Sequence, residues 1–285
     1  MAITAADVKK LREETGAGPM ECKNVLTETN GDFEKAVKIL KEKGLAAAEK
    51  RADRATNNGR VSIKVKDNTA VLVELSSETD FVARNPEFIE LGGQIADKVF
   101  EKGSDKLDAI LADLNEMVKD LATKIRENMS LKRVEVVKAE ANDYLASYIH
   151  GDGVIGVVVR LNADKPGIFN NEDAKNFAVS LAMHVAAFNP LAVSSSNVDP
   201  SSLTEQKEIF KKQMEADEKL KGKPEKVLDG ILQGKVKKYL SEICFLDQAY
   251  IKNDKITVAQ ALAEEGKKAG TTFTIASYKS FRVGA

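Results

Sequence analysis

The sequence contains no tryptophan, and only two cysteines and two histidines occur among its 285 residues. Cys22 and Cys244 can form one pair at most, which is unusual for a secreted chain of this length, so both are expected to be reduced thiols. His150 and His184 lie outside any C-x-x-C or H-E-x-x-H spacing, so no metal site is predicted. We expect His184, in an apolar helical segment, to be a satisfied core or interface group, and His150, at a hairpin tip, to be a surface contact.

Neither a long hydrophobic run nor an excess of one charge is present. No stretch approaches the roughly 18 apolar residues of a membrane span, and residues 1–4 lack the start of a signal peptide, so a cytoplasmic location without membrane contact is expected. The 43 basic and 44 acidic residues give a net charge of −1, whereas nucleic-acid binders usually carry a basic patch. Residues 205–240 hold ten lysines against seven acidic residues, which indicates a solvated helical face before a phosphate-binding track.

Motifs for catalysis or nucleotide binding are scarce. Residues 151–156 fit the spacing G-x-G-x-x-G, but in a dinucleotide site such a turn opens a helix. Here it leads into the apolar run Val157-Val158-Val159, so a hairpin turn is the better interpretation. Neither a G-x-x-x-x-G-K-[ST] loop nor a serine nucleophile elbow occurs. The sequence therefore predicts no enzyme, no cofactor and no direct nucleotide binding.

The residues that are present predict an α+β fold with a small three-helix N-terminal domain. Gly16 to Pro19 separate the first two helices, and the third begins at Asp32 and is expected to end near Gly44. The stretch 45–59 is interpreted as a helical or extended linker. A domain of this size, at the lower limit of independent stability, is more often a docking module than an enzyme.

A two-part α+β core of β-hairpins and packed helices is predicted next. Val61, Ile63 and Val65 alternate with polar residues, which is typical of a half-buried strand. The first half is expected to contain strands at 61–65 and 70–75, helices at 86–101 and 105–127, and a strand at 131–139. The same order of hairpin, loop and helix recurs over 144–188, which suggests two related halves.

The last part of the chain changes character. Residues 199–241 predict a protruding antiparallel helical hairpin with coiled-coil character, because their first helix has few apolar residues. Residues 271–278 have β character and could complete a sheet edge or dock as a tail. The predicted domains are 1–54, 55–140, 141–198 together with 242–263, 199–241, and a C-terminal module at 264–285.

One aromatic residue lies in the connection between a strand and a helix. Residues 77–86 follow the apolar strand candidate 70–75 and precede a helix that Asn85 and Pro86 are suited to start. Most loops are polar, so Phe81 either folds back into the core or is offered to another molecule. The residues by themselves favour packing inward.

Three stretches match motifs of one known family: Leu11-Arg12 with Thr15-Gly16-Ala17-Gly18, Met20 and Cys22-Lys23; Thr79-Asp80-Phe81-Val82-Ala83; and Ala182-Met183-His184-Val185-Ala186-Ala187. Together they resemble the bacterial translation elongation factor Ts family, in its long type. The similarity extends over essentially the whole chain. Pro19 in the N-terminal turn and Glu78 before the second motif depart from the family pattern.

The resemblance implies a guanine nucleotide exchange factor that acts on the GTPase elongation factor Tu during protein biosynthesis. It implies an N-terminal domain of the ubiquitin-associated type and a helical hairpin that is a candidate for dimerisation. The partner-binding residues that it implies, which would displace Mg²⁺ in elongation factor Tu, are Thr79, Asp80, Phe81 and Val82, with Phe81 as a wedge. Met20 and His150 are secondary contact candidates, and no nucleic acid is expected.

A rival interpretation is a non-catalytic RNA-binding or replication-complex subunit that uses the lysine-rich residues 205–240. The near-neutral net charge and the lack of interleaved aromatic and basic residues argue against it.

Overall fold

The structure is a computed structural model that describes residues 3–102 and 106–285. By its internal contacts the chain divides into two compact units. Unit 1 comprises residues up to Lys138, Ile149–Gly156 and Phe281–Ala285, and unit 2 comprises Ala139–Tyr148 and Val157–Ser280. The α+β class predicted from the sequence is confirmed by helices and small sheets in the same chain. The finer division into five domains stays a prediction.

Unit 1 begins with the helices α1 (Ala5–Thr15), α2 (Pro19–Glu28) and α3 (Phe33–Glu49). Thr4 caps α1 through a reciprocal pair of hydrogen bonds with Asp7, which satisfies amide groups that the first turn leaves unpaired. The three helices share a small apolar core that consists of Leu11, Ala17, Cys22, Val25, Leu26, Ala36 and Leu40.

The prediction that the third helix ends near Gly44 is wrong, because α3 continues through Gly44 to Glu49. A Cβ atom at Gly44 would lie 2.4 Å from Cγ2 of Thr123 on helix α6 (Leu107–Ile125). The missing side chain therefore allows two helices to approach each other and does not end one. Part of the predicted linker is thus helix.

The sheet of unit 1 has the order β1-β2-β3, with β2 (Thr69–Ser77) antiparallel to both β1 (Asn58–Lys66) and β3 (Met129–Lys138). The predicted hairpin turn at 67–68 joins β1 to β2. α5 (Pro86–Lys102) and α6 bury their apolar sides in one cluster with β2. The predicted helix at 105–127 is confirmed over α6, while residue 105 lies outside the described residues.

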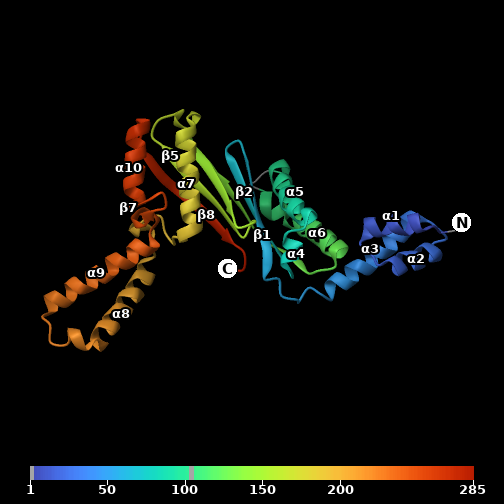
Figure 1. Ribbon diagram of the computed structural model, residues 1–285, viewed down its shortest axis with the longest axis horizontal. Coiled ribbons are helices and arrows are strands. Elements are labelled where there is room, and N and C mark those ends of the chain that lie inside the picture. Colours follow the sequence, from blue (N-terminus) through green and yellow to red (C-terminus); the bar gives the residue numbers. More distant parts are fainter. Residues whose placement is uncertain (1–2, 103–105) are drawn as a thin grey trace. The chain divides into compact units, whose positions relative to one another are not determined.

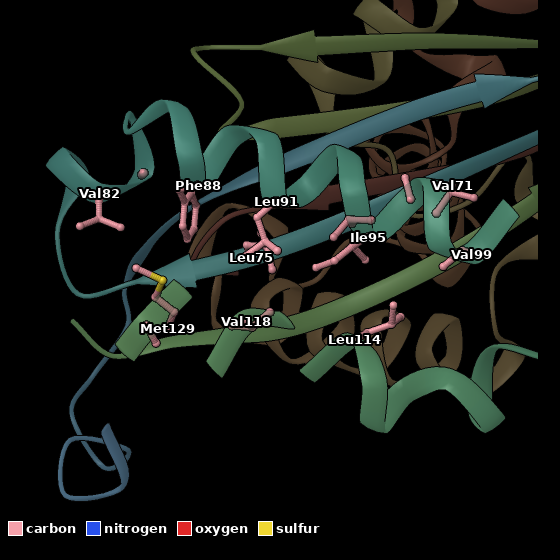
Figure 2. Packing of buried hydrophobic residues seen from close by; sticks show 14 of the residues in the cluster. Val71, Leu75, Val82, Phe88, Leu91, Ile95, Val99, Leu114, Val118 and Met129 are labelled. Atoms are coloured by element: carbon pink, nitrogen blue, oxygen red, sulfur yellow. The ribbon is translucent and has the colours of Figure 1, made fainter. Parts of the chain in front are cut away.

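The core of unit 1 includes residues from the strands, both helices and the connection before α5. Figure 2 shows Val71 and Leu75 of β2 in one cluster with Phe88, Ile95 and Leu114. Val65 is expected from the sequence on the buried side of its strand, but the residue is 40% exposed. It lies next to the β1–β2 turn, opposite Ala70, at the end of the strand where burial declines along β1.

A second sheet has the order β4-β5-β8 and lies mostly in unit 2. Its strands are β4 (Asp143–His150), β5 (Ile155–Ala163) and β8 (Phe273–Arg282). β8 therefore completes a sheet edge, which decides between the two alternatives left open by the sequence. Unit 2 also contains α7 (Glu172–Phe188), α10 (Val258–Ala269), and the short strands β6 (Ala249–Tyr250) and β7 (Asn253–Thr257).

The predicted helical hairpin is formed by α8 (Pro200–Ala216) and α9 (Glu225–Ile243) (Figure 1). Within these two described helices only Met214 is buried, as the sparse apolar residues of the first helix predicted. The chain segments before α8 and after α9 lie side by side at the base of the hairpin. There Phe245 donates its backbone N–H to the carbonyl of Ala192 at 2.9 Å, and Leu191 donates to the carbonyl of Ile243 at 2.8 Å.

Across residues 3–102 and 106–285, the structure contains no helix with the length and apolar character to cross a membrane.

Candidate functional site

The connection that carries Phe81 is not an irregular loop throughout, because residues Asp80–Ala83 form a short helix, α4. Thr79 caps it from an extended conformation and accepts a hydrogen bond from the Val82 amide on its side chain, with a distance of 3.4 Å. Threonine is a favoured residue at this position because its hydroxyl can satisfy an unpaired amide of the first turn.

Phe81 is 82% exposed, which is the highest value among the exposed large hydrophobic residues of the described chain. The expectation from the residues by themselves, that this ring packs inward, is therefore wrong. Val82 is only 6% exposed and belongs to the apolar cluster of unit 1, and Figure 2 shows it at the end of that cluster where Phe88 and Met129 lie. Since successive helix residues point about 100° apart, anchoring Val82 directs Phe81 away from the core.

The first residue of the site is held by a carboxylate that sequence reasoning missed. Glu127 accepts a hydrogen bond from the Thr79 backbone N–H at 3.1 Å, and its two oxygens accept from Thr79 Oγ1 at 2.9 and 3.1 Å. Ser77 Oγ donates to the Thr79 carbonyl at 2.9 Å. Polar groups thus hold Thr79 from both sides, while Val82 is held by apolar packing.

Glu78, a departure from the family pattern, is also fixed. Its side-chain Oε1 accepts from the Asn128 backbone N–H at 2.6 Å, and its carbonyl accepts from Asn58 Nδ2 at 2.8 Å. Asn128, like Glu127, carries no signal in the sequence, because both lie in the short polar stretch between α6 and β3. A polar residue there is expected of any connection.

Asp80, the fourth of the implied partner-binding residues, is exposed. Its Oδ2 lies 3.5 Å from Nη1 of Arg84, four residues further along the chain. An exposed pair of this kind contributes little to stability, so both charges are available for contacts with another molecule. Asp80 and Arg84 also line a pocket of about 200 Å³ together with Gly151, Asp152 and Val154 of the β4–β5 turn.

The G-x-G-x-x-G stretch forms that turn, as predicted. Gly151, Asp152 and Gly153 all have positive φ angles, and the chain continues into β5 and not into a helix. Val61 donates its backbone N–H to the Gly153 carbonyl at 2.7 Å. The turn is therefore attached to the edge of β1, beside the connection that carries Phe81.

The two secondary candidates are both exposed. Met20 is 68% exposed on the first turn of α2, and His150 is an exposed residue at the end of β4. His150 immediately precedes the turn that shares a pocket with Asp80. Met20 lies on α2. The residue that follows it, Glu21, forms an ion pair with Arg126, with 2.7 Å between Glu21 Oε2 and Arg126 Nη2.

Comparison with known proteins bears on the whole chain. A family model described as elongation factor TS matches residues 78–285. The elongation factor Ts of Treponema denticola is 47% identical over 284 residues, which cover 100% of this chain and 99% of that protein. The elongation factor Ts of Borreliella burgdorferi is 41% identical over 283 residues, with 99% of each chain covered. The chain belongs to the elongation factor Ts family.

The family identity makes this chain a translation elongation factor. The described residues contain no group of three or more His, Cys, Asp or Glu side chains that could hold a metal ion. Both cysteines are buried free thiols. Burial raises the pKa of the Cys22 and Cys244 thiols, which disfavours the reactive thiolate.

His184 of this elongation factor is a core group of unit 2, one of the two roles expected from the sequence. Its ring is completely buried and stacks between Phe188 and Phe245, with centroid distances of 4.6 and 5.2 Å. Nδ1 accepts from the Ile251 backbone N–H at 3.2 Å, so Nε2 carries the proton and donates to Gln248 Oε1 at 2.9 Å. Burial lowers the pKa of His184, against the smaller opposing effect of the Gln248 hydrogen bond.

We expect acid to destabilise unit 2 through this histidine. Because the pKa of His184 is lower in the folded than in the unfolded state, the unfolded state binds the proton more readily. The stabilising contribution is complete above about pH 6.5 and is lost as pH falls through the lowered pKa. Urea unfolding between pH 7 and 5 should show the free energy of unfolding falling by at most about 1.4 kcal/mol per pH unit from this group.

His184→Gln should flatten that slope while lowering stability at pH 7, and His150→Gln serves as the control for loss of a histidine. A slope that is unchanged in His184→Gln would assign the acid sensitivity to other groups.

Proposed function

We propose that this chain is a guanine nucleotide exchange factor that binds elongation factor Tu with GDP and promotes GDP release. The observation that carries the proposal is the exposure of Phe81 on a turn anchored by Val82 and Thr79. A large aromatic side chain that is fixed in an exposed position is suited to enter a pocket of a partner, because aromatic residues are enriched among the residues that dominate binding energy. Phe81 would enter the partner near its Mg²⁺ and phosphate site, and Asp80 would make polar contacts beside it.

The proposed reaction needs no catalytic group in this chain. A GTPase holds GDP through amides of its phosphate loop and through Mg²⁺ that bridges phosphate and protein. An exchange factor must bind the nucleotide-free state better than the GDP-bound state. A thousandfold loss of GDP affinity corresponds to about 4 kcal/mol of coupling, of which one buried aromatic can supply about 2 kcal/mol or more.

Other parts of the chain would add affinity without driving release. Met20 on α2 and His150 beside the β4–β5 turn are proposed secondary contacts, because both are exposed and lie apart from the Phe81 turn in sequence. The α8–α9 hairpin buries little of its own surface, and we propose it as a surface for dimerisation.

Coupling of this kind is reciprocal, so nucleotide must drive the two proteins apart. We expect the purified chain to form a complex with nucleotide-free elongation factor Tu that elutes as one species in size-exclusion chromatography. Adding GDP should dissociate it. A complex that survives saturating GDP would contradict the exchange function.

The rival RNA-binding role makes a different prediction for the same protein. Electrophoretic mobility shift with RNA alone, over a salt series, should show no specific complex, because the 43 basic and 44 acidic residues of the sequence give a net charge of only −1. A tight shift that weakens steeply with salt would favour the rival.

A further inference from the structure

Phe81 is presented by a turn that is itself held from a distant part of the sequence. We propose that Glu127 and Asn128 are positioning residues, which fix the turn Thr79–Ala83 in the conformation that presents the Phe81 ring to the partner. This inference rests on the proposed role of Phe81 in nucleotide exchange. It assigns a function to the short polar segment between α6 and β3.

The need for such support follows from the size of α4. A helix of four residues cannot stabilise itself, because nucleation of the first turn is unfavourable. On one side the turn is fixed by Val82, which packs in the apolar cluster. On the other side it depends on Thr79, whose hydroxyl accepts from the Val82 amide.

Glu127 determines how Thr79 is oriented. The carboxylate takes both Thr79 donors, the backbone N–H and the hydroxyl. A hydroxyl that donates to the carboxylate keeps its lone pairs for the Val82 amide, so Glu127, Thr79 and Val82 form a continuous chain of hydrogen bonds. Bonds to an ionised acceptor are stronger than neutral ones, and each strengthens the next.

Asn128, the next residue after Glu127, connects the polar segment between α6 and β3 to the part of the chain that precedes β1. Its side-chain Nδ2 donates to the carbonyls of Ala52 and Arg54 at 3.0 and 2.7 Å, and its backbone N–H donates to Glu78. Arg54 in turn lies 3.4 Å from Glu78 Oε2. The residue before Thr79 is therefore connected to the same support as Thr79 itself.

The position of Arg126, where the supporting segment 126–128 begins, is fixed as well. Arg126 ends α6 in the left-handed conformation, with φ of 68°, and its guanidinium lies 2.7 Å from Glu21 on α2. Residues 126–128 thus contact the N-terminal helices, the chain before β1 and the Phe81 turn. A segment attached to the rest of unit 1 at several places is suited to hold the turn in one conformation.

The test is Glu127→Gln, which keeps the shape of the side chain but places an amide N–H₂ against one of the Thr79 donors. We expect the maximal rate of GDP release from elongation factor Tu to fall about tenfold, equivalent to about 1.4 kcal/mol. The half-saturating concentration should change less than about twofold, because docking through other surfaces does not need the turn. Glu116→Gln, an exposed acid of α6, is the matched control.

Two further measurements separate positioning from a general loss of stability. Hydrogen exchange of the Thr79 and Val82 amides in the free protein should accelerate about tenfold in Glu127→Gln, equivalent to about 1.4 kcal/mol, while amides of β2 stay protected. Thr79→Val should slow GDP release, and Glu127→Gln should cost less in the Thr79→Val variant than in the wild type, because the bond through the Thr79 hydroxyl is already absent and only the bond from the backbone N–H remains.

Normal GDP release by Glu127→Gln, alongside slow release by Phe81→Ala, would overturn the positioning role and leave the exchange function intact. Additive losses in the double variant, or equal loss of protection in β2, would also overturn it. If Phe81→Ala itself releases GDP at the wild-type rate, the exchange proposal fails and the positioning role fails with it.

Discussion

Phe81→Ala should slow stimulated GDP release from elongation factor Tu about 30-fold while the protein stays folded. The ring is 82% exposed, so its removal takes no contact from the core, and the Val82 anchor and the Thr79 cap remain. Truncating an aromatic residue at the centre of an interface to alanine typically costs about 2 kcal/mol of interaction free energy. If that energy is used to expel GDP, its loss slows release about 30-fold. Release of a fluorescent GDP analogue, over a series of concentrations of the chain, measures it.

Leu111→Ala is the matched control, because Leu111 is a large hydrophobic residue of unit 1 that is 43% exposed on α6 and lies outside the proposed contacts. It should release GDP like the wild type, and both variants should keep the wild-type thermal midpoint within about 2 °C. Unchanged release by Phe81→Ala would exclude the wedge role. A large loss in Leu111→Ala would show that exposure by itself does not identify the site.

Gly16→Ala should be strongly destabilising and should loosen the N-terminal helices from α6. Gly16 has φ of +65°, and a Cβ atom there would lie 2.0 Å from the carbonyl oxygen of Lys124. The left-handed conformation costs about 1–2 kcal/mol with a side chain, and the clash with backbone adds about 1–3 kcal/mol because neither partner is a flexible side chain. We expect the free energy of unfolding to fall by about 2–5 kcal/mol in total, measured by urea unfolding.

Gly18→Ala provides a control two residues away in the same Thr15-Gly16-Ala17-Gly18 motif. Gly18 has φ of −64°, and no atom lies within 4 Å of the position that an added Cβ would take, so the change should cost less than about 1 kcal/mol. Hydrogen exchange at the end of α6 should increase in Gly16→Ala and not in Gly18→Ala. Equal effects of the two substitutions would mean that the contact with Lys124 does not hold the helices in place.

The elements that the sequence predicts well are those whose signal is local. The β1–β2 hairpin follows from alternating residues such as Val61 and Ile63 and from a polar two-residue turn. The start of α5 follows from Asn85, whose Oδ1 accepts from the Glu87 amide at 2.9 Å. In each case the residues that determine the structure lie within a few positions of one another.

The features that the sequence does not predict depend on distant partners. Gly44 looks like the end of a helix, and the reason for its small size is Thr123 on another helix. Phe81 looks like a core residue until the anchor at Val82 is known. Glu127 bonds Thr79 across 48 positions, and no spacing rule connects a carboxylate after one helix to a hydroxyl before another.

The α8–α9 hairpin has an evolutionary consequence, which follows from how its two ends meet. The segments that precede and follow the hairpin bond to each other, since Ala192 forms a β-bridge with Cys244 and Leu246 donates to the Val193 carbonyl at 3.0 Å. The hairpin contributes one buried residue, Met214, from its two helices. A segment closed at its base and nearly absent from the core can be lengthened, shortened or replaced between species without remodelling the domain that carries it.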